Sequence, residues 1–82
     1  MSVKIYTTNY CGYCKRAIEI LKSRKIEFEE VDVTDDDLQR TKLVELTGLR
    51  TVPQIFINSK SIGGYDDLMK LIERGELDKL FS

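Results

Sequence analysis

The chain has 82 residues, and its 13 lysine and arginine residues against 14 aspartate and glutamate residues give a formal net charge of −1. This near balance excludes a broad positive field for holding nucleic acid or an anionic membrane. The length predicts one domain over residues 1–82, and no apolar run is long enough for a membrane span. The chain begins with a strand-like segment and not with a signal peptide, so we expect a cytoplasmic protein.

The first half of the chain alternates between strand and helix patterns. Residues 3–7 alternate in the period of a half-buried strand, and helical spacing then appears at Cys14, Ala17, Ile18 and Leu21. β-Branched residues within 28–33 predict a second strand. Residues 34–37 have the Ser/Thr-x-x-acid form of a helix start, with Thr34 at the cap position. They predict a second helix from about Asp35 to Thr47, ended by Gly48.

The second half of the chain predicts a hairpin followed by helix. A continuous apolar run at 54–58 predicts a central strand, and a turn at 59–60 leads to a short strand at 61–62. The glycine pair at 63–64 ends this hairpin, and a further helix is marked by Leu68, Leu71 and Ile72. Gly75 ends that helix, and a last helical turn is indicated by Leu77, Leu80 and Phe81.

The order of elements, β-α-β-α-β-β-α, restricts the topology. A strand–helix–strand opening forces a parallel pair with a right-handed crossover, whereas the later hairpin is antiparallel. We therefore expect an α/β fold in which helices cover a mixed four-stranded sheet as a three-layer α/β/α sandwich.

Cys11 and Cys14, separated by two residues, lie where the loop after the first strand meets the start of a helix. Unpaired N–H groups and the positive end of the helix dipole favour the thiolate form of Cys11, and the thiolate is the nucleophilic form. Lys15 and Arg16 add positive potential nearby. Cys14 is about one turn inside the helix, which predicts a shielded, resolving thiol.

Other interpretations of the cysteine pair are open at this stage. Half of a zinc site would need further Cys or His ligands, but the chain has no His and only these two Cys. Two inert core cysteines are disfavoured by a glycine-containing C-x-x-C at a strand-to-helix junction. A helix start without function remains only if the other motifs of the chain are coincidental.

The chain contains, in this order, Cys11-Gly12-Tyr13-Cys14, Thr51-Val52-Pro53 and Gly63-Gly64-Tyr65-Asp66-Asp67. Together these motifs resemble the glutaredoxin family over nearly the whole chain, and that family has the thioredoxin-like fold. The resemblance implies a glutathione-dependent enzyme that reduces protein disulfides and glutathione mixed disulfides. Cys11 and Cys14 are then catalytic, and glutathione is the co-substrate. The implied partners are glutathione and disulfide-containing or glutathionylated proteins such as ribonucleotide reductase.

The resemblance also implies a glutathione site formed by Tyr13, Arg40, Thr51, Val52, Pro53, Gly64, Tyr65, Asp66 and Asp67. The peptide before Pro53 is expected to be cis, with the Val52 backbone turned toward the Cys11 sulfur. Asp67 is expected to accept from the γ-glutamyl ammonium, and Arg40 is expected to hold the glycine carboxylate. Without the resemblance, helix capping explains the aspartates and a solvated helix face explains Arg40. An ordinary trans proline and a surface ring for Tyr13 are the corresponding alternatives.

Two positions depart from the family pattern. Thr8 stands where many glutaredoxins have Lys, which leaves more of the carboxylate recognition to Arg40 and Arg50. Gly12 stands where the commonest dithiol members have Pro. Members with Gly or Ser there include some that bind a [2Fe–2S] cluster between two subunits, through the first cysteine of each and two glutathiones. We expect a monomer with no metal, and the alternatives are such a cluster-binding dimer through Cys11 or a redoxin served by thioredoxin reductase.

Overall fold

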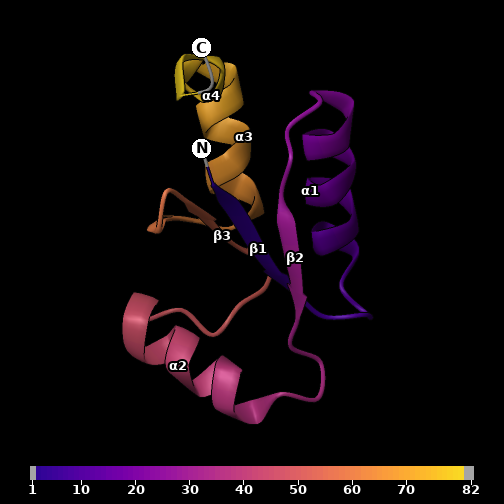
Figure 1. The fold of residues 1–82 in the computed structure, drawn as a ribbon, viewed down its shortest axis with the longest axis vertical. Coiled ribbons are helices and arrows are strands. Elements are labelled where there is room, and N and C mark those ends of the chain that lie inside the picture. Colours follow the sequence, from indigo (N-terminus) through magenta and orange to yellow (C-terminus); the bar gives the residue numbers. More distant parts are fainter. Residues whose placement is uncertain (1, 81–82) are drawn as a thin grey trace.

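The computed structural model describes residues 2–80, which fold around a single sheet (Figure 1). Its elements are β1 (Val3–Thr7), α1 (Gly12–Ser23), β2 (Glu29–Asp32), α2 (Asp37–Thr47), β3 (Gln54–Ile57), β4 (Lys60–Gly63), α3 (Tyr65–Glu73) and α4 (Glu76–Leu80). The strand order is β2-β1-β3-β4, with β1 and β2 parallel and the other neighbours antiparallel. The predicted α/β fold with a mixed four-stranded sheet is confirmed. No helix within residues 2–80 has the length and apolar character to cross a membrane.

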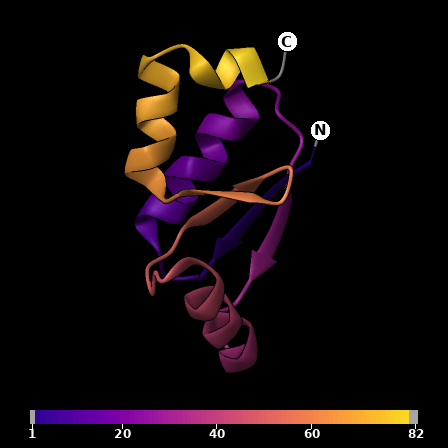
Figure 2. The ribbon, with the colours of Figure 1, turned by 90° about the vertical axis from the view of Figure 1, so that its left-hand side faces the viewer.

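The helices are divided between the faces of the sheet. α1 and α3 lie together on one face, as Figure 2 shows, and the inward side chains of β1 and β3 pack against them. The buried cluster there consists of Val3, Ile5, Ala17, Leu21, Ile55, Ile57, Leu68 and Leu77. Tyr6 alternates to the opposite face, where it lines a cavity with Phe56 of β3 and Leu46 of α2. Burying each large apolar side chain contributes about 1.5–3 kcal/mol, so the sheet and α1–α3 layer form the stable platform.

The start of α2 differs from the prediction. Asp36, and not Thr34, is the N-cap, and its carboxylate accepts the Gln39 N–H at 3.1 Å. The Thr34 hydroxyl is engaged elsewhere, since it donates to the Asp32 carboxylate at 2.5 Å and accepts the Asn9 N–H at 2.8 Å. The capping-box pattern was therefore wrong about the capping residue, because a carboxylate two residues upstream competes for the hydroxyl.

Other boundaries shift by a few residues. The second strand covers only Glu29–Asp32 of the predicted 28–33 segment, and the hairpin turn lies at Asn58 and Ser59, whose φ angles are 51° and 67°. Gly48 ends α2 as predicted, with a φ of 76° and its N–H bonded to the Val44 carbonyl. The last helical turn is α4, although Phe81, which the prediction included, lies outside the described residues.

Candidate active site

Cys11 is the N-cap of α1. Its backbone is extended, with φ −95° and ψ 113°, and its Sγ accepts the Cys14 N–H at 3.1 Å. Its own N–H donates to the Thr8 carbonyl at 3.4 Å. A cap side chain normally satisfies a first-turn N–H through oxygen, and here sulfur takes that place. The Cys11 sulfur is partly exposed and lies at the positive end of the α1 dipole, where negative charge is stabilised.

Cys14 lies one turn inside α1 and faces the sheet with only 1% of its surface exposed. Both cysteines are free thiols. Burial raises the pKa of Cys14 to about 12, helped by its hydrogen bond with Cys11 and the nearby Cys11 and Glu30 charges, while a hydrogen bond with the Thr8 backbone opposes the rise. Cys14 is therefore a protonated thiol at neutral pH, and Cys11 is the sulfur that an outside disulfide can reach.

The loop between α2 and β3 places a backbone carbonyl beside the Cys11 sulfur. The Val52–Pro53 peptide is cis, as expected, and the Cys11 Sγ lies 3.6 Å from the Val52 carbonyl oxygen. Pro53 is buried and Thr51 is exposed. The backbone at Thr51 and Val52 lies outside the strands beside Cys11 and lines both cavities, so a peptide-like ligand that is linked to Cys11 can reach it.

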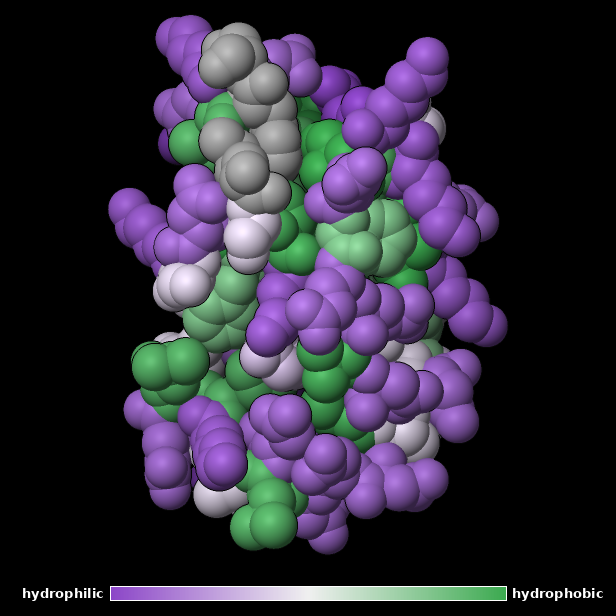
Figure 3. Space-filling view, in the orientation of Figure 1, coloured by the Kyte–Doolittle hydropathy of each residue, from purple (hydrophilic) through white to green (hydrophobic). Residues whose placement is uncertain are grey.

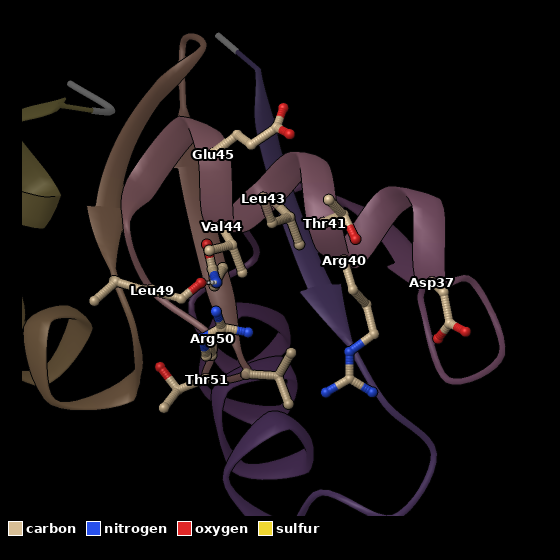
Figure 4. Close-up of a pocket in the computed structure, with 11 residues that line it drawn as sticks. Asp37, Arg40, Thr41, Leu43, Val44, Glu45, Leu49, Arg50 and Thr51 are labelled. Atoms are coloured by element: carbon tan, nitrogen blue, oxygen red, sulfur yellow. Dashed lines mark hydrogen bonds between the residues drawn. The ribbon is translucent and has the colours of Figure 1, made fainter.

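Two adjoining cavities flank this loop and share Leu49, Thr51 and Val52 as lining residues. The first, shown in Figure 4, extends under α2 and is also lined by Asp37, Arg40 and Arg50. The second is lined by Tyr13, Pro53, Gly64, Tyr65, Asp66 and Asp67. The structure thus brings the predicted glutathione-site residues to two ends of one groove, with the Val52 loop between them.

Charged side chains of both signs line the first end of the groove, with Asp37 and Glu45 beside two arginines. Arg40 and Arg50 both line the cavity beneath α2 (Figure 4). The Arg40 Nη1 donates to the Tyr10 hydroxyl oxygen at 3.3 Å. This hydrogen bond, with a smaller contribution from Asp37, raises the pKa of the Arg40 guanidinium, so its positive charge is secure at any working pH.

The start of α3 forms the other end. Gly64 is its N-cap and offers no side chain to the first-turn N–H groups, while the Asp67 carboxylate reaches back to the Gly64 N–H at 2.9 Å. A Cβ on Gly64 would lie 3.2 Å from the Pro53 carbonyl oxygen, so glycine lets α3 approach the cis-proline loop closely. N–H groups without a side-chain cap at a helix N-terminus suit an anion such as a carboxylate.

Aromatic rings form a wall of the second cavity. Tyr13 of α1 and Tyr65 of α3 have ring centroids 5.3 Å apart, and the Arg16 guanidinium lies 5.4 Å from the Tyr13 centroid. Tyr13 still has 56% of its surface exposed, so it is in contact with its neighbours and also open to a ligand. The role of Tyr13 at the glutathione site therefore stays a prediction, beside the alternative of a surface ring.

Sequence reasoning missed the residues that support the loop before Cys11. Asn9 and Tyr10 are joined to Thr34 and Arg40, respectively, by hydrogen bonds between segments distant in sequence. Only the position of Tyr10 next to Cys11 could have drawn attention to it. Within residues 2–80, no group of three or more His, Cys, Asp or Glu side chains could hold a metal ion. A cluster shared between two copies through Cys11 stays an alternative to the predicted monomer.

A reactive cysteine that caps a helix, a buried second thiol and a cis-proline loop on this sheet define a thiol–disulfide oxidoreductase of the thioredoxin-like fold. The glutaredoxin family model matches residues 3–62. Glutaredoxin 3 of Escherichia coli K12 is 43% identical over 79 residues, covering 96% of this chain and 95% of the relative. A Pseudomonas aeruginosa glutaredoxin is 41% identical over 80 residues, covering 98% of this chain and 95% of the relative.

Solved structures agree with these matches. The buckwheat glutaredoxin–glutathione complex has a TM-score of 0.91 at 30% identity, covering 95% of this chain and 74% of that one. The Brucella melitensis glutaredoxin has a TM-score of 0.87 at 42% identity, covering 98% and 87%. The chain belongs to the glutaredoxin family. It is a glutathione-dependent thiol–disulfide oxidoreductase, with glutathione as its co-substrate.

Proposed function

We propose that Cys11 removes glutathione from glutathionylated proteins and, together with Cys14, reduces protein disulfides, all within one domain of residues 1–82. The observation that carries this proposal is the position of the Cys11 sulfur, 3.6 Å from the carbonyl oxygen of Val52, a residue that lines both cavities. A ligand joined to this sulfur has the cavity lined by Arg40 and Arg50 on one side and the open start of α3 on the other. Glutathione, which carries a carboxylate at each end, matches that arrangement.

The proposed binding mode runs along the groove in one direction. The cysteinyl part of glutathione pairs with the backbone at Thr51 and Val52, before Pro53, in the manner of an added strand. Its glycine carboxylate lies beneath α2, where Arg40 provides a charge-assisted hydrogen bond. Tyr13 borders the sulfur on the opposite side of the loop.

At the other end, the γ-glutamyl group meets the start of α3. Its carboxylate accepts from the first-turn N–H groups of Tyr65 and Asp66, which Gly64 leaves uncapped. Its ammonium group donates to Asp67, whose carboxylate already accepts the Gly64 N–H at 2.9 Å. A carboxylate has about four lone-pair sites, so capping and ligand binding are compatible at Asp67.

The monothiol reaction uses one sulfur only. The Cys11 thiolate attacks the glutathione sulfur of a mixed disulfide, so that a Cys11–glutathione disulfide forms and the target leaves as a thiolate. A second glutathione thiolate then attacks the glutathione sulfur on Cys11, which releases glutathione disulfide and restores the Cys11 thiolate. Electrons balance because each exchange breaks one S–S bond and forms another.

The dithiol reaction adds Cys14. When Cys11 is joined to a target protein, Cys14 loses its proton and attacks the Cys11 sulfur, which releases the target thiolate and leaves a Cys11–Cys14 disulfide. Burial keeps the pKa of Cys14 near 12 in the reduced protein, so this step is the slower route at neutral pH. Two glutathiones then reduce the disulfide.

The physiological setting is also part of the proposal. We infer a monomer that works in the cytoplasm, where glutathione keeps thiols reduced, on disulfide-containing or glutathionylated proteins such as ribonucleotide reductase. Charges of both signs line the groove, which supports a small zwitterionic ligand. Arg40, Arg50, Asp37 and Glu45 line one end, and Asp66 and Asp67 line the other. Nucleic acid and membranes are not among the proposed partners.

Two single substitutions test the assignment of the sulfurs. Turnover of a glutathionylated peptide, coupled to glutathione reductase, should fall by at least about a thousandfold in Cys11→Ser, because the nucleophile is lost. Cys14→Ser should keep most of this activity while losing reduction of a protein disulfide. Equal damage to deglutathionylation in both variants would contradict the monothiol route. A wild-type protein reduced by thioredoxin reductase and not by glutathione would contradict the glutathione site.

A further inference from the structure

Tyr10 is a prominent side chain at the site that the motifs leave without a role. It directly precedes Cys11, and 68% of its surface is exposed. Its hydroxyl oxygen accepts a hydrogen bond from the Arg40 Nη1 at 3.3 Å, which joins the loop before α1 to α2. Thirty residues separate the two partners in sequence, so this contact exists only in the folded chain.

The loop that carries Tyr10 is held on both sides. The Cys11 N–H donates to the Thr8 carbonyl at 3.4 Å, and the Asn9 N–H donates to the Thr34 hydroxyl at 2.8 Å. Thr34 is itself fixed by Asp32 through its backbone N–H and its hydroxyl. A tyrosine has only two side-chain torsions, so holding its ring in one geometry costs less entropy than holding an arginine. Tyr10 thus extends from a held backbone to Arg40 through its hydroxyl.

Arg40 and Arg50 line the same cavity but differ in restraint. An arginine side chain has several torsions and loses substantial entropy when it is held in one geometry. Arg40 is restrained by Tyr10, whereas the guanidinium of Arg50 makes no hydrogen bond or ion pair within residues 2–80. Arg40 therefore loses less side-chain entropy than Arg50 would when a carboxylate binds in the cavity.

We propose that Tyr10 is a positioning residue that holds Arg40 toward the glycine carboxylate of the glutathionyl group on Cys11. By doing so, Tyr10 increases the preference of the site for glutathione over thiols that lack this carboxylate. The inference rests on the proposed function, because it uses the assignment of Arg40 to that carboxylate.

The test measures an equilibrium and not turnover. In a Cys14→Ser background, the Cys11 thiolate reacts with glutathione disulfide to give the Cys11–glutathione disulfide and one glutathione thiolate, and mass spectrometry of the intact protein gives the equilibrium constant. Tyr10→Phe should lower this constant about threefold, as expected for one exposed hydrogen bond. Arg40→Gln should lower it about tenfold, because a charge-assisted hydrogen bond is lost.

Two comparisons separate the positioning of Arg40 by Tyr10 from a general structural effect of the substitution. With the disulfide of glutathione glycyl ethyl ester, which has no glycine carboxylate, Tyr10→Phe should leave the equilibrium constant unchanged. In an Arg40→Gln background, Tyr10→Phe should cause no further loss with either disulfide, because the arginine it supports is absent. Tyr6→Phe removes the same hydroxyl from the distant face of the sheet and serves as the matched control.

The possible failures are distinguishable. A loss in Tyr10→Phe that is equal for acid and ester, or that adds fully to the loss in Arg40→Gln, would overturn the inference and leave the proposed function intact. The inference is also overturned, with the proposed function intact, if Arg40→Gln lowers the equilibrium constant for glutathione disulfide and not for the ester disulfide while Tyr10→Phe changes neither constant. If Arg40→Gln changes the equilibrium constants for both disulfides equally, Arg40 does not bind the glycine carboxylate, and the inference is wrong as well. If Cys11 forms no glutathione disulfide at all, the proposed function itself is wrong.

Discussion

The two helices that border the site begin in opposite ways. At the start of α1, the Cys11 sulfur caps the helix by accepting the Cys14 N–H at 3.1 Å. At the start of α3, Gly64 has no side chain to offer, and Asp67 instead satisfies the Gly64 N–H at 2.9 Å. The first helix start is therefore capped by a sulfur of its own chain, whereas the second leaves N–H groups for an anion that comes from outside.

This difference assigns disulfide exchange and ligand recognition to different helix starts in the proposed function. The reactive sulfur belongs to α1 and the open donors belong to α3, and the Val52–Pro53 loop lies against both. Val52 approaches the Cys11 sulfur, and the Pro53 carbonyl lies against Gly64. In the proposed function, a disulfide exchanged at one helix start leaves its glutathione bound at the other.

The strongest expected effect concerns the buried thiol in the first turn of α1. Burial raises the pKa of Cys14 from its ordinary value of 9.0 to about 12, so the folded state binds this proton more tightly than the unfolded state does. Its stabilising contribution is complete below pH 9 and is lost as the pH rises toward about 12. Urea unfolding at several alkaline pH values should show a steeper loss of unfolding free energy in the wild type than in Cys14→Ala. Parallel curves for the two proteins would contradict this.

A paired glycine substitution sharpens the comparison of the two helix starts. Gly63 precedes the α3 cap with a φ of 102°, and a Cβ there would overlap the Asp67 carboxylate. Gly63→Ala should therefore cost about 1–3 kcal/mol of unfolding free energy. It should also weaken glutathionylation of Cys11, because Asp67 is displaced. A Cβ on Gly12, at the start of α1, meets nothing within 4 Å, so Gly12→Ala is the control. Similar unfolding free energies in chemical denaturation of both variants would refute the distinction.

The sequence predicted the framework because its signals are local. Alternation in residues 3–7, the helical spacing after Cys11 and the glycine that ends α2 each depend on neighbours in the chain. Thr34 was misassigned as the cap of α2 because its hydroxyl donates to the Asp32 carboxylate and accepts the Asn9 N–H. Asn9 lies 25 residues away in the sequence. A four-residue cap motif contains no information about a hydrogen-bond partner that is so distant in the sequence.

The candidate site shows the same limit. The sulfurs, the cis-proline loop and the α3 start were anticipated from motifs that resemble a family. The structure places the loop and the α3 start on one groove and the Cys11 sulfur against the loop. The support from Tyr10 to Arg40 was not anticipated, because a hydrogen bond between a loop and a distant helix leaves no spacing pattern in the sequence. Residues that hold other residues in place are visible only after folding.

Removing one carboxylate at each of two helix starts separates capping from ligand binding. Asp67→Ala and Asp36→Ala should each lower the unfolding free energy by about 1 kcal/mol, since both carboxylates accept backbone N–H groups near a helix start. Only Asp67→Ala should also lower the equilibrium constant for glutathionylation of Cys11. Thermal unfolding and mass spectrometry measure the two effects separately. An equal loss of glutathionylation in Asp36→Ala would show that helix stability alone governs binding.

The smallest effect is expected from Gly12→Pro at the first position of α1. Proline suits this position because its fixed φ matches the helix and the first N–H has no partner within the helix. Cys11, with φ −95° and ψ 113°, already has the extended backbone that a residue before proline requires. The unfolding free energy of the variant should rise by about 0.4–1 kcal/mol, because proline lowers the conformational entropy of the unfolded chain. A loss of stability in urea unfolding would mean that the Gly12 N–H supports the sulfurs at the α1 start, and the capping of α1 would then involve more than the Cys11 sulfur.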